Sequence, residues 1–141
     1  MNTGMATNPP RVVLDTNILI SSFSFGGKPR EVLFKVLGKE IAGVTSQILV
    51  AELIDVERKK FNLTRTDTKL IETQIEDNFE IVFPTKSVKV CRHDSDNRVL
   101  EAAIEGKCDF IVTGDKDLLI LKRYKSVTIL KPSEFLDTIA N

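Results

Sequence analysis

Four acidic residues stand where strands and helices are expected to begin or end: Asp15, Glu52, Asp96 and Asp115. Asp15 and Asp115 each follow a short run of β-branched and aliphatic residues that is typical of a buried strand. Asp96 and Glu52 lie in the first turns of expected helices. Because ligands of open parallel sheets bind at the carboxyl ends of the strands, where helices also begin, we expect these four carboxylates at one edge.

Each of these acids also has a purely structural interpretation. An Asp at a helix start is usually an N-cap, which is the alternative for Asp96, and an Asp after a strand is usually a turn residue, which is the alternative for Asp15. Glu52 fits a structural role less well, because a buried Glu needs a partner or a bound cation. Its neighbours at helical spacing are all apolar: Ile48, Leu49, Leu53 and Val56.

Converging carboxylates indicate a particular chemistry. Two unit charges about 4 Å apart repel by roughly 4 kcal/mol at an effective dielectric constant of 20, so such a cluster needs a cation or partial protonation. Oxygen ligands suit Mg²⁺ or Mn²⁺, which activate water and stabilise charge on a phosphate during hydrolysis. The single histidine, His93, and two cysteines without CxxC spacing, Cys91 and Cys108, argue against a zinc site or a disulfide framework.

Length and composition limit what else the chain can be. Its 141 residues are 42% hydrophobic, which predicts one globular domain over residues 11–141 after a flexible leader at residues 1–10. Twenty Lys and Arg balance twenty Asp and Glu, so a broad polycationic binder of nucleic acid is excluded, although a local basic patch is not. The chain shows neither a signal peptide nor an apolar run of about 18 residues, and we expect a cytoplasmic protein without membrane association.

The elements that must position the acids alternate along the chain. This alternation predicts an α/β fold, a three-layer α/β/α sandwich with a central parallel sheet of four to five strands. Strands are expected at residues 11–16, 41–45, 80–84, 110–114 and, as an edge strand, 127–130. Helices are expected at 17–23, from Pro29 to Gly38, from Ser46 to Lys60, from Thr66 or Asp67, at 96–105, as a short stretch at 118–123, and from Pro132 or Ser133.

Three segments together resemble the PIN-domain ribonuclease family. They are VVLDTN at 12–17, the stretch from Ser46 to Glu52, and DSDNRVLEAAIEGKCDFIVTGDKDL at 94–118. The resemblance extends from about residue 11 to about residue 135, and it is strongest to the prokaryotic VapC-like toxin components of toxin–antitoxin pairs. It implies a PIN-like sandwich, an RNA substrate, an antitoxin partner and a homodimer.

The resemblance also implies roles for individual residues. The four acids of the family match Asp15, Glu52, Asp96 and Asp115, with the three aspartates as ligands of one or two Mg²⁺ or Mn²⁺ ions and Glu52 as ligand or general base. Asp117 matches an auxiliary acid, and three polar residues match those that hold the carboxylates or a metal-bound water: Thr16, Asn17 and Thr113. Relatives often have an acid where this chain has His93, and Asp94 is offset from that position by one residue.

Basic and aromatic residues suggest where RNA would lie. The basic residues that follow the last acids are predicted to bind its backbone: Lys116, Lys122, Arg123 and Lys125. Phe23 and Phe25 would stack on bases or pack in the core or a dimer. Two other functions stay open, a non-catalytic PIN-like module that binds RNA or a partner, and a magnesium-dependent phosphotransferase. The phosphotransferase is disfavoured because Asn17 stands where such enzymes need a second Asp.

Overall fold

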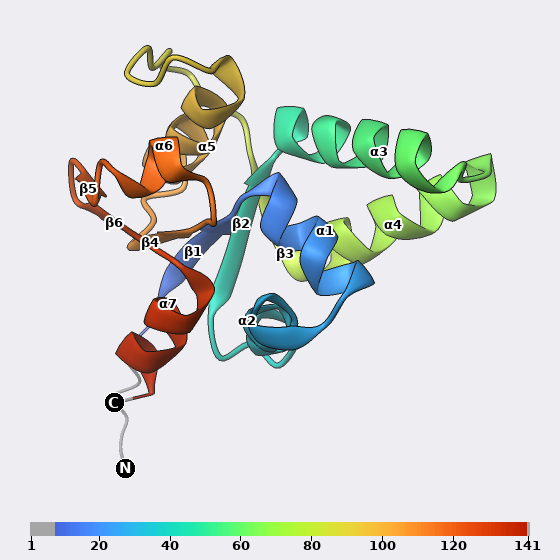
Figure 1. Cartoon of the computed structure of the whole chain (residues 1–141), viewed down its shortest axis with the longest axis horizontal. Helices are drawn as coiled ribbons and strands as arrows, with labels where there is room; N and C mark the ends of the chain where they lie inside the picture. Colours follow the sequence, from blue (N-terminus) through green and yellow to red (C-terminus); the bar gives the residue numbers. More distant parts are fainter. Residues whose placement is uncertain (1–7, 141) are drawn as a thin grey trace.

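Short strands pair into one six-stranded sheet in the computed structural model, which describes residues 8–140 (Figure 1). The strand order is β3-β2-β1-β4-β6-β5, and every pair is parallel except β5 with β6. The predicted parallel sheet of up to five strands is therefore confirmed, with an antiparallel sixth strand added. The strands are β1 (Arg11–Leu14), β2 (Ala42–Ser46), β3 (Phe79–Val82), β4 (Phe110–Val112), β5 (Arg123–Tyr124) and β6 (Val127–Leu130).

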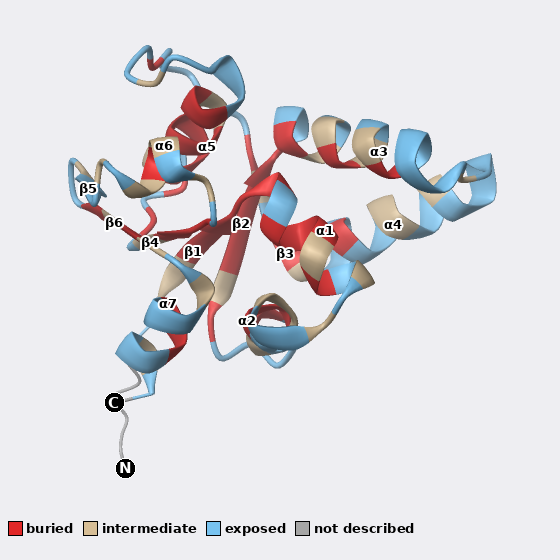
Figure 2. Ribbon diagram, in the orientation of Figure 1, coloured by how far each residue is buried: buried red, intermediate tan, exposed pale blue. Residues whose placement is uncertain are grey.

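Helices cover both faces of this sheet, which confirms the three-layer architecture (Figure 2). Alternate residues of a strand point to opposite faces. Val12 and Leu14 of β1 belong to one hydrophobic cluster, and Val13 between them belongs to the other. The helices are α1 (Thr16–Ser24), α2 (Gly27–Leu37), α3 (Gln47–Phe61), α4 (Arg65–Asn78), α5 (Asp94–Glu105), α6 (Lys116–Leu119) and α7 (Pro132–Ile139).

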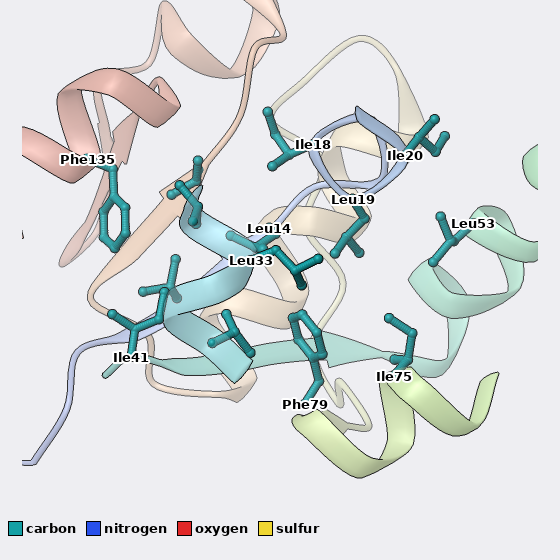
Figure 3. Close-up of a cluster of buried hydrophobic side chains, with 14 of the residues drawn as sticks. Leu14, Ile18, Leu19, Ile20, Leu33, Ile41, Leu53, Ile75, Phe79 and Phe135 are labelled. Atoms are coloured by element: carbon teal, nitrogen blue, oxygen red, sulfur yellow. The ribbon is translucent and has the colours of Figure 1, made fainter. Parts of the chain in front are cut away.

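The first cluster joins β1 to α1, α2, α7 and the inner sides of α3 and α4 (Figure 3). Leu14 from β1, Leu19 from α1 and Leu33 from α2 lie at its centre. The second cluster packs α5 and α6 against the opposite face, where Leu100 and Leu118 are fully buried. Both clusters hold the carboxyl ends of β1 and β4 rigidly, so the side chains that follow these strands have fixed positions.

Several element boundaries differ from those predicted. The helix α4 begins after Thr64, whose side chain accepts a hydrogen bond from the amide of Asp67 while Asp67 accepts one from the amide of Thr64. This capping box moves the start ahead of the predicted Thr66 or Asp67. The strand 127–130 was predicted at an edge, which is wrong because β5 pairs along its outer side. The short helix lies at Lys116–Leu119 rather than at 118–123, because Asp115 caps it.

The leader predicted at residues 1–10 is described only in part. The predicted leader lies mostly in residues 1–7, which are outside the described residues, and residues 8–10 have no regular secondary structure. Within residues 8–140, no helix combines the length and apolar character needed to cross a membrane.

Candidate metal centre

Asp15 lies at the carboxyl end of β1 and serves two purposes at once. Its side chain is 5% exposed, and Oδ1 accepts a hydrogen bond of 2.9 Å from the amide of Ile18, so Asp15 is the N-cap of α1. Its second oxygen, Oδ2, accepts a hydrogen bond from the hydroxyl of Thr113. Asp15 is therefore a helix N-cap rather than the turn residue of the structural alternative, and its second oxygen faces the end of β4.

Thr113 connects the end of β1 to the end of β4. The register places Leu14 opposite Val112, so Asp15 and Thr113 are the next residues on neighbouring strands. The fully buried hydroxyl of Thr113 donates to Asp15 and accepts a hydrogen bond of 3.0 Å from the amide of Asp115. Asp115 in turn caps α6, because its Oδ1 accepts from the amide of Asp117 at 2.8 Å. One threonine thus fixes the relative positions of two acids.

Asp96 approaches the same place from α5. The helix begins two residues earlier than predicted, with His93 at the N-cap position, so Asp96 lies inside the first turn and its interpretation as an N-cap is wrong. Carboxylate oxygens of Asp96, Asp115 and Asp117 all lie within 4.8 Å of one another. Asp96 is 5% exposed, and its Oδ2 is buried without a hydrogen-bond partner among the described residues. Because an unpaired buried oxygen is costly, this atom fits a cation ligand.

A small cavity of about 50 Å³ brings the remaining predicted residues to the aspartates. Glu52 enters it from α3, and Thr16 and Asn17 enter it from the first turn of α1. The cavity is far smaller than the several hundred Å³ of a typical small-molecule pocket, so its size suits an ion and water. Its lining consists of Asp15, Thr16, Asn17, Glu52, Ser95, Asp96, Val99 and Asp115.

The crowding of acids changes their affinity for protons. Burial raises the pKa of Asp15 from 3.8 to about 6, and the charges of Asp115 and Glu52 add to this, whereas the hydrogen bonds from Thr113 and Ile18 oppose it. Burial also raises the pKa of Asp96 to about 6, with further increases from Asp115 and Asp117. A divalent cation stabilises the ionised form of each acid, so protons and cations would compete for these oxygens.

Comparison with known proteins identifies the family. A family model described as a PIN domain matches residues 11–117, which contain every acid of the site. The chain belongs to the PIN-domain family. The uncharacterized protein MJ1680 of Methanocaldococcus jannaschii is 28% identical to this PIN domain in an alignment 140 residues long, which covers 90% of each chain.

Two solved structures share the fold of this PIN domain. VapBC2 from Rickettsia felis, bound to a DNA fragment from its promoter, contains a chain with a TM-score of 0.60 and 17% identity, covering 84% of this chain and 96% of the other. FitAcB from Neisseria gonorrhoeae gives a TM-score of 0.52 and 15% identity, covering 86% of this chain and 98% of the other. At these identities the likeness concerns the fold alone.

Two residues of the PIN-domain site were missed by the sequence analysis, Arg92 and Ser95. Ser95 lines the cavity, and Arg92 Nε lies 3.1 Å from Asp117 Oδ2. His93 Nε2 lies 3.6 Å from the same oxygen. Asp94 is exposed at the start of α5, outside both the cavity lining and the group of three aspartates. Arg92 adjoins the motif that carries Asp96, and this adjacency was the available signal.

The predicted basic residues do not form one strip beside the acids. Lys116 directly follows Asp115, and the carbonyl of Lys122 accepts a hydrogen bond from the amide of Ile129 in the carboxyl half of β6. The chain then reverses through β5, where Arg123 lies opposite Thr128. Lys125 lies beside Lys107 at the amino end of the sheet, away from the acids.

Phe23 of α1 and Phe25, the residue that follows this helix, are also absent from the cavity lining. Phe25 is 72% exposed, and Phe23 is partly exposed; neither belongs to the hydrophobic clusters. The Lys60 ammonium lies 5.5 Å from the centre of the Phe25 ring, at the far ends of α1 and α3. Packing in the core is therefore wrong for Phe25, and its role in a dimer or in stacking on bases stays a prediction.

Proposed function

We propose that this PIN domain is a metal-dependent endoribonuclease that hydrolyses phosphodiester bonds of RNA. The observation that carries the proposal is the convergence of Asp96, Asp115 and Asp117 within 4.8 Å, with a buried Asp96 oxygen that has no partner among residues 8–140. A buried carboxylate oxygen without a partner, grouped with two half-buried carboxylates, is the kind of oxygen donor set that Mg²⁺ and Mn²⁺ prefer.

Each side chain has a role in this proposal. Asp15, Asp96 and Asp115 would hold one or two Mg²⁺ or Mn²⁺ ions, and Glu52, on the α3 side of the cavity, would act as a further ligand or as general base toward water. The bound ion supplies positive charge to the phosphate and lowers the pKa of water. Thr113 holds Asp15 and the Asp115 turn in register, while Thr16 and Asn17 supply polar groups at the rim.

The hydrogen bonds of Asp15 argue against the phosphotransferase alternative. A phospho-acceptor needs a carboxylate oxygen that is free to attack phosphorus. Both oxygens of Asp15 accept hydrogen bonds, from Ile18 and from Thr113, and the side chain is almost fully buried. These contacts favour a fixed ligand over a nucleophile.

The structural relatives support a further proposal about biological role. Because the two solved relatives carry the names VapBC2 and FitAcB, we propose that this chain is the toxin of a type II toxin–antitoxin pair. The homodimer implied by the family resemblance is part of the same proposal. The antitoxin would be encoded by the neighbouring reading frame. Co-expression of that frame should give a complex that co-purifies and in which RNA cleavage is suppressed.

An isosteric substitution at Asp96 tests the nuclease proposal. Asp96→Asn removes one negative charge. It breaks no hydrogen bond at Oδ2, because this oxygen has no donor among the described residues. We expect it to lower Mn²⁺-dependent cleavage of total cellular RNA by more than about 100-fold and to weaken Mn²⁺ binding measured by calorimetry. Asp94→Asn, an exposed position on the same helix turn, is the matched control.

Three results would contradict the proposal. Cleavage by Asp96→Asn at the wild-type rate would show that Asp96 is not part of the active site. Cleavage that persists in EDTA would show that the reaction does not need a metal ion. Strong Mn²⁺ binding by the wild-type protein with no cleavage of any RNA would support the non-catalytic module instead.

A further inference from the structure

The segment between β3 and α5 has no regular secondary structure, yet its backbone is fixed at four amides (Figure 1). We call residues 85–91 the strap. The amide of Thr85 donates to Glu105 at 2.9 Å, and the amide of Val88 donates to Glu101 at 2.8 Å. The amides of Val90 and Cys91 both donate to Asn97 Oδ1, at 3.1 and 2.8 Å.

The acceptors of the strap lie on one face of α5. Asn97, Glu101 and Glu105 are spaced four residues apart, and such residues stack along one side of a helix. Asn97 also donates from Nδ2 to the carbonyl of Cys91 at 2.9 Å. The amide and the carbonyl of this last strap residue are therefore both bound by Asn97. The chain therefore reaches Arg92 with its backbone position determined by α5, the same helix that carries Asp96.

Arg92 is exposed but points back to the acids. Its side chain is 78% exposed, and its Nε lies 3.1 Å from Asp117 Oδ2. Among residues 8–140, no hydrogen bond engages its two terminal NH₂ groups. An ion pair this exposed stabilises a fold only weakly, so stability gives little reason for an arginine here.

The negative charge around the site gives a functional reason for an arginine at position 92. Five carboxylates meet at the cavity and its rim: Asp15, Glu52, Asp96, Asp115 and Asp117. They repel the phosphates of an approaching RNA. Within the described part of the chain, Arg92 and His93 are the basic side chains within ion-pair distance of this group, both at Asp117, and His93 carries a charge only when it is protonated. A guanidinium offers two parallel N–H groups that match a phosphate, which His93 does not.

We propose that Arg92 is a phosphate-binding residue of the site, positioned by the strap so that its terminal NH₂ groups receive an RNA phosphate beside the metal-binding acids. This inference rests on the proposed nuclease function and adds a substrate contact to it. Asp117 holds the guanidinium through Nε and leaves its outer edge for the phosphate. His93 lies near the same Asp117 oxygen, 3.6 Å away.

Binding of a labelled RNA tests the proposal without depending on catalysis. The probe is a fluorescein-labelled single-stranded RNA of mixed sequence, titrated in EDTA with Asp15→Asn protein so that it is not consumed. Adding Arg92→Gln should weaken binding about tenfold, because a charge-assisted hydrogen bond is lost. The slope of log K against log salt should fall by about 0.7, the value for one phosphate contact on a single strand.

A control on the same strap makes the result specific. Lys89→Gln removes one exposed charge three residues away, and no ion pair joins Lys89 to the acids. It should reduce affinity much less than Arg92→Gln. Arg92→Lys should keep the salt slope and lose most of the affinity, because lysine keeps the charge without the paired N–H groups. The melting temperature of Arg92→Gln should equal that of the control.

The outcomes separate this inference from the nuclease proposal. If Arg92→Gln and Lys89→Gln change affinity and salt slope equally, Arg92 is not a phosphate-binding residue, even if the wild-type protein cleaves RNA. If the wild-type protein cleaves no RNA but Arg92→Gln alone weakens binding, the nuclease proposal fails and the phosphate contact is supported. A melting temperature lowered by Arg92→Gln well beyond the control would assign the residue a structural role and overturn the inference.

Discussion

Replacing Asp15 by Asn should stabilise the metal-free protein at alkaline pH while removing its activity. Raising the pKa of Asp15 from 3.8 to about 6 means that the folded state binds this proton more tightly than the unfolded state. Stability from this group is thus fully present below pH 4 and is lost as the pH rises through about 6. The loss corresponds to about 3 kcal/mol. Asparagine stays neutral at every pH, so the Asp15→Asn protein does not lose this stability as the pH rises.

The hydrogen bonds of Asp15 oppose this gain, because the substitution by Asn loses part of their stabilisation. Asn is as good an N-cap as Asp, so one of the bonds from Ile18 and Thr113 is kept by its single carbonyl oxygen. Losing the other costs about 1 kcal/mol. We therefore expect Asp15→Asn to be about 1 kcal/mol less stable than wild type at pH 4 and about 2 kcal/mol more stable at pH 8.

Urea denaturation in EDTA at both pH values measures this difference. Asp55→Asn is the control, because Asp55 is exposed on α3 and pairs with Lys59 outside the site; its effect should be small and nearly equal at the two pH values. Adding Mn²⁺ should raise the stability of wild type but not of Asp15→Asn. An effect of Asp15→Asn that is the same at pH 4 and pH 8 would refute the reasoning, because it would mean that Asp15 ionises without a penalty.

Two further substitutions probe the supports of the site. Thr113→Val keeps the shape of a fully buried side chain but leaves an Asp15 oxygen and the Asp115 amide without their partner, so it should cost about 2–4 kcal/mol in urea denaturation and raise the Mn²⁺ concentration needed for half-saturation. Unchanged stability would show that Thr113 does not link the ends of β1 and β4. Glu101→Ala removes the acceptor of both Val88 and Arg98, each 2.8 Å away, and should cost about 3 kcal/mol and accelerate hydrogen exchange at the Val88 amide. Protection of that amide at the wild-type level would show that the strap does not depend on Glu101.

The parts of the site that follow regular patterns could be predicted from the sequence. Asp15 and Asp115 follow apolar strands, and parallel pairing brings the ends of neighbouring strands together, as the register of Leu14 with Val112 shows. Glu52 was found by the helical spacing of its apolar neighbours. The order of elements along the chain likewise determined the layers, because strands separated by helices pair in parallel.

Other features depend on contacts that no local pattern encodes. The two-residue strand β5 is too short to show a period, and it carries Lys125 to the opposite end of the sheet from the acids. The first turn of α5 is polar and shows no apolar spacing, so the start predicted at Asp96 lies two residues after the observed start at Asp94. Arg92 belongs to a loop whose position is determined by side chains of a helix that comes later in the chain.

The strap is held through its main chain, and this has a consequence for how its sequence can vary. Its amides bind Glu105, Glu101 and Asn97, and Thr85 is the strap residue whose side chain also donates to one of them, Glu105. Most other exposed positions between residues 85 and 91 can therefore be exchanged without loosening the strap. Proline is the exception at the four donor positions, because it has no N–H. The sequence of the strap can therefore vary while its attachment to α5 stays the same. Replacing its exposed residues would change the surface next to the acids and leave α5 unaltered.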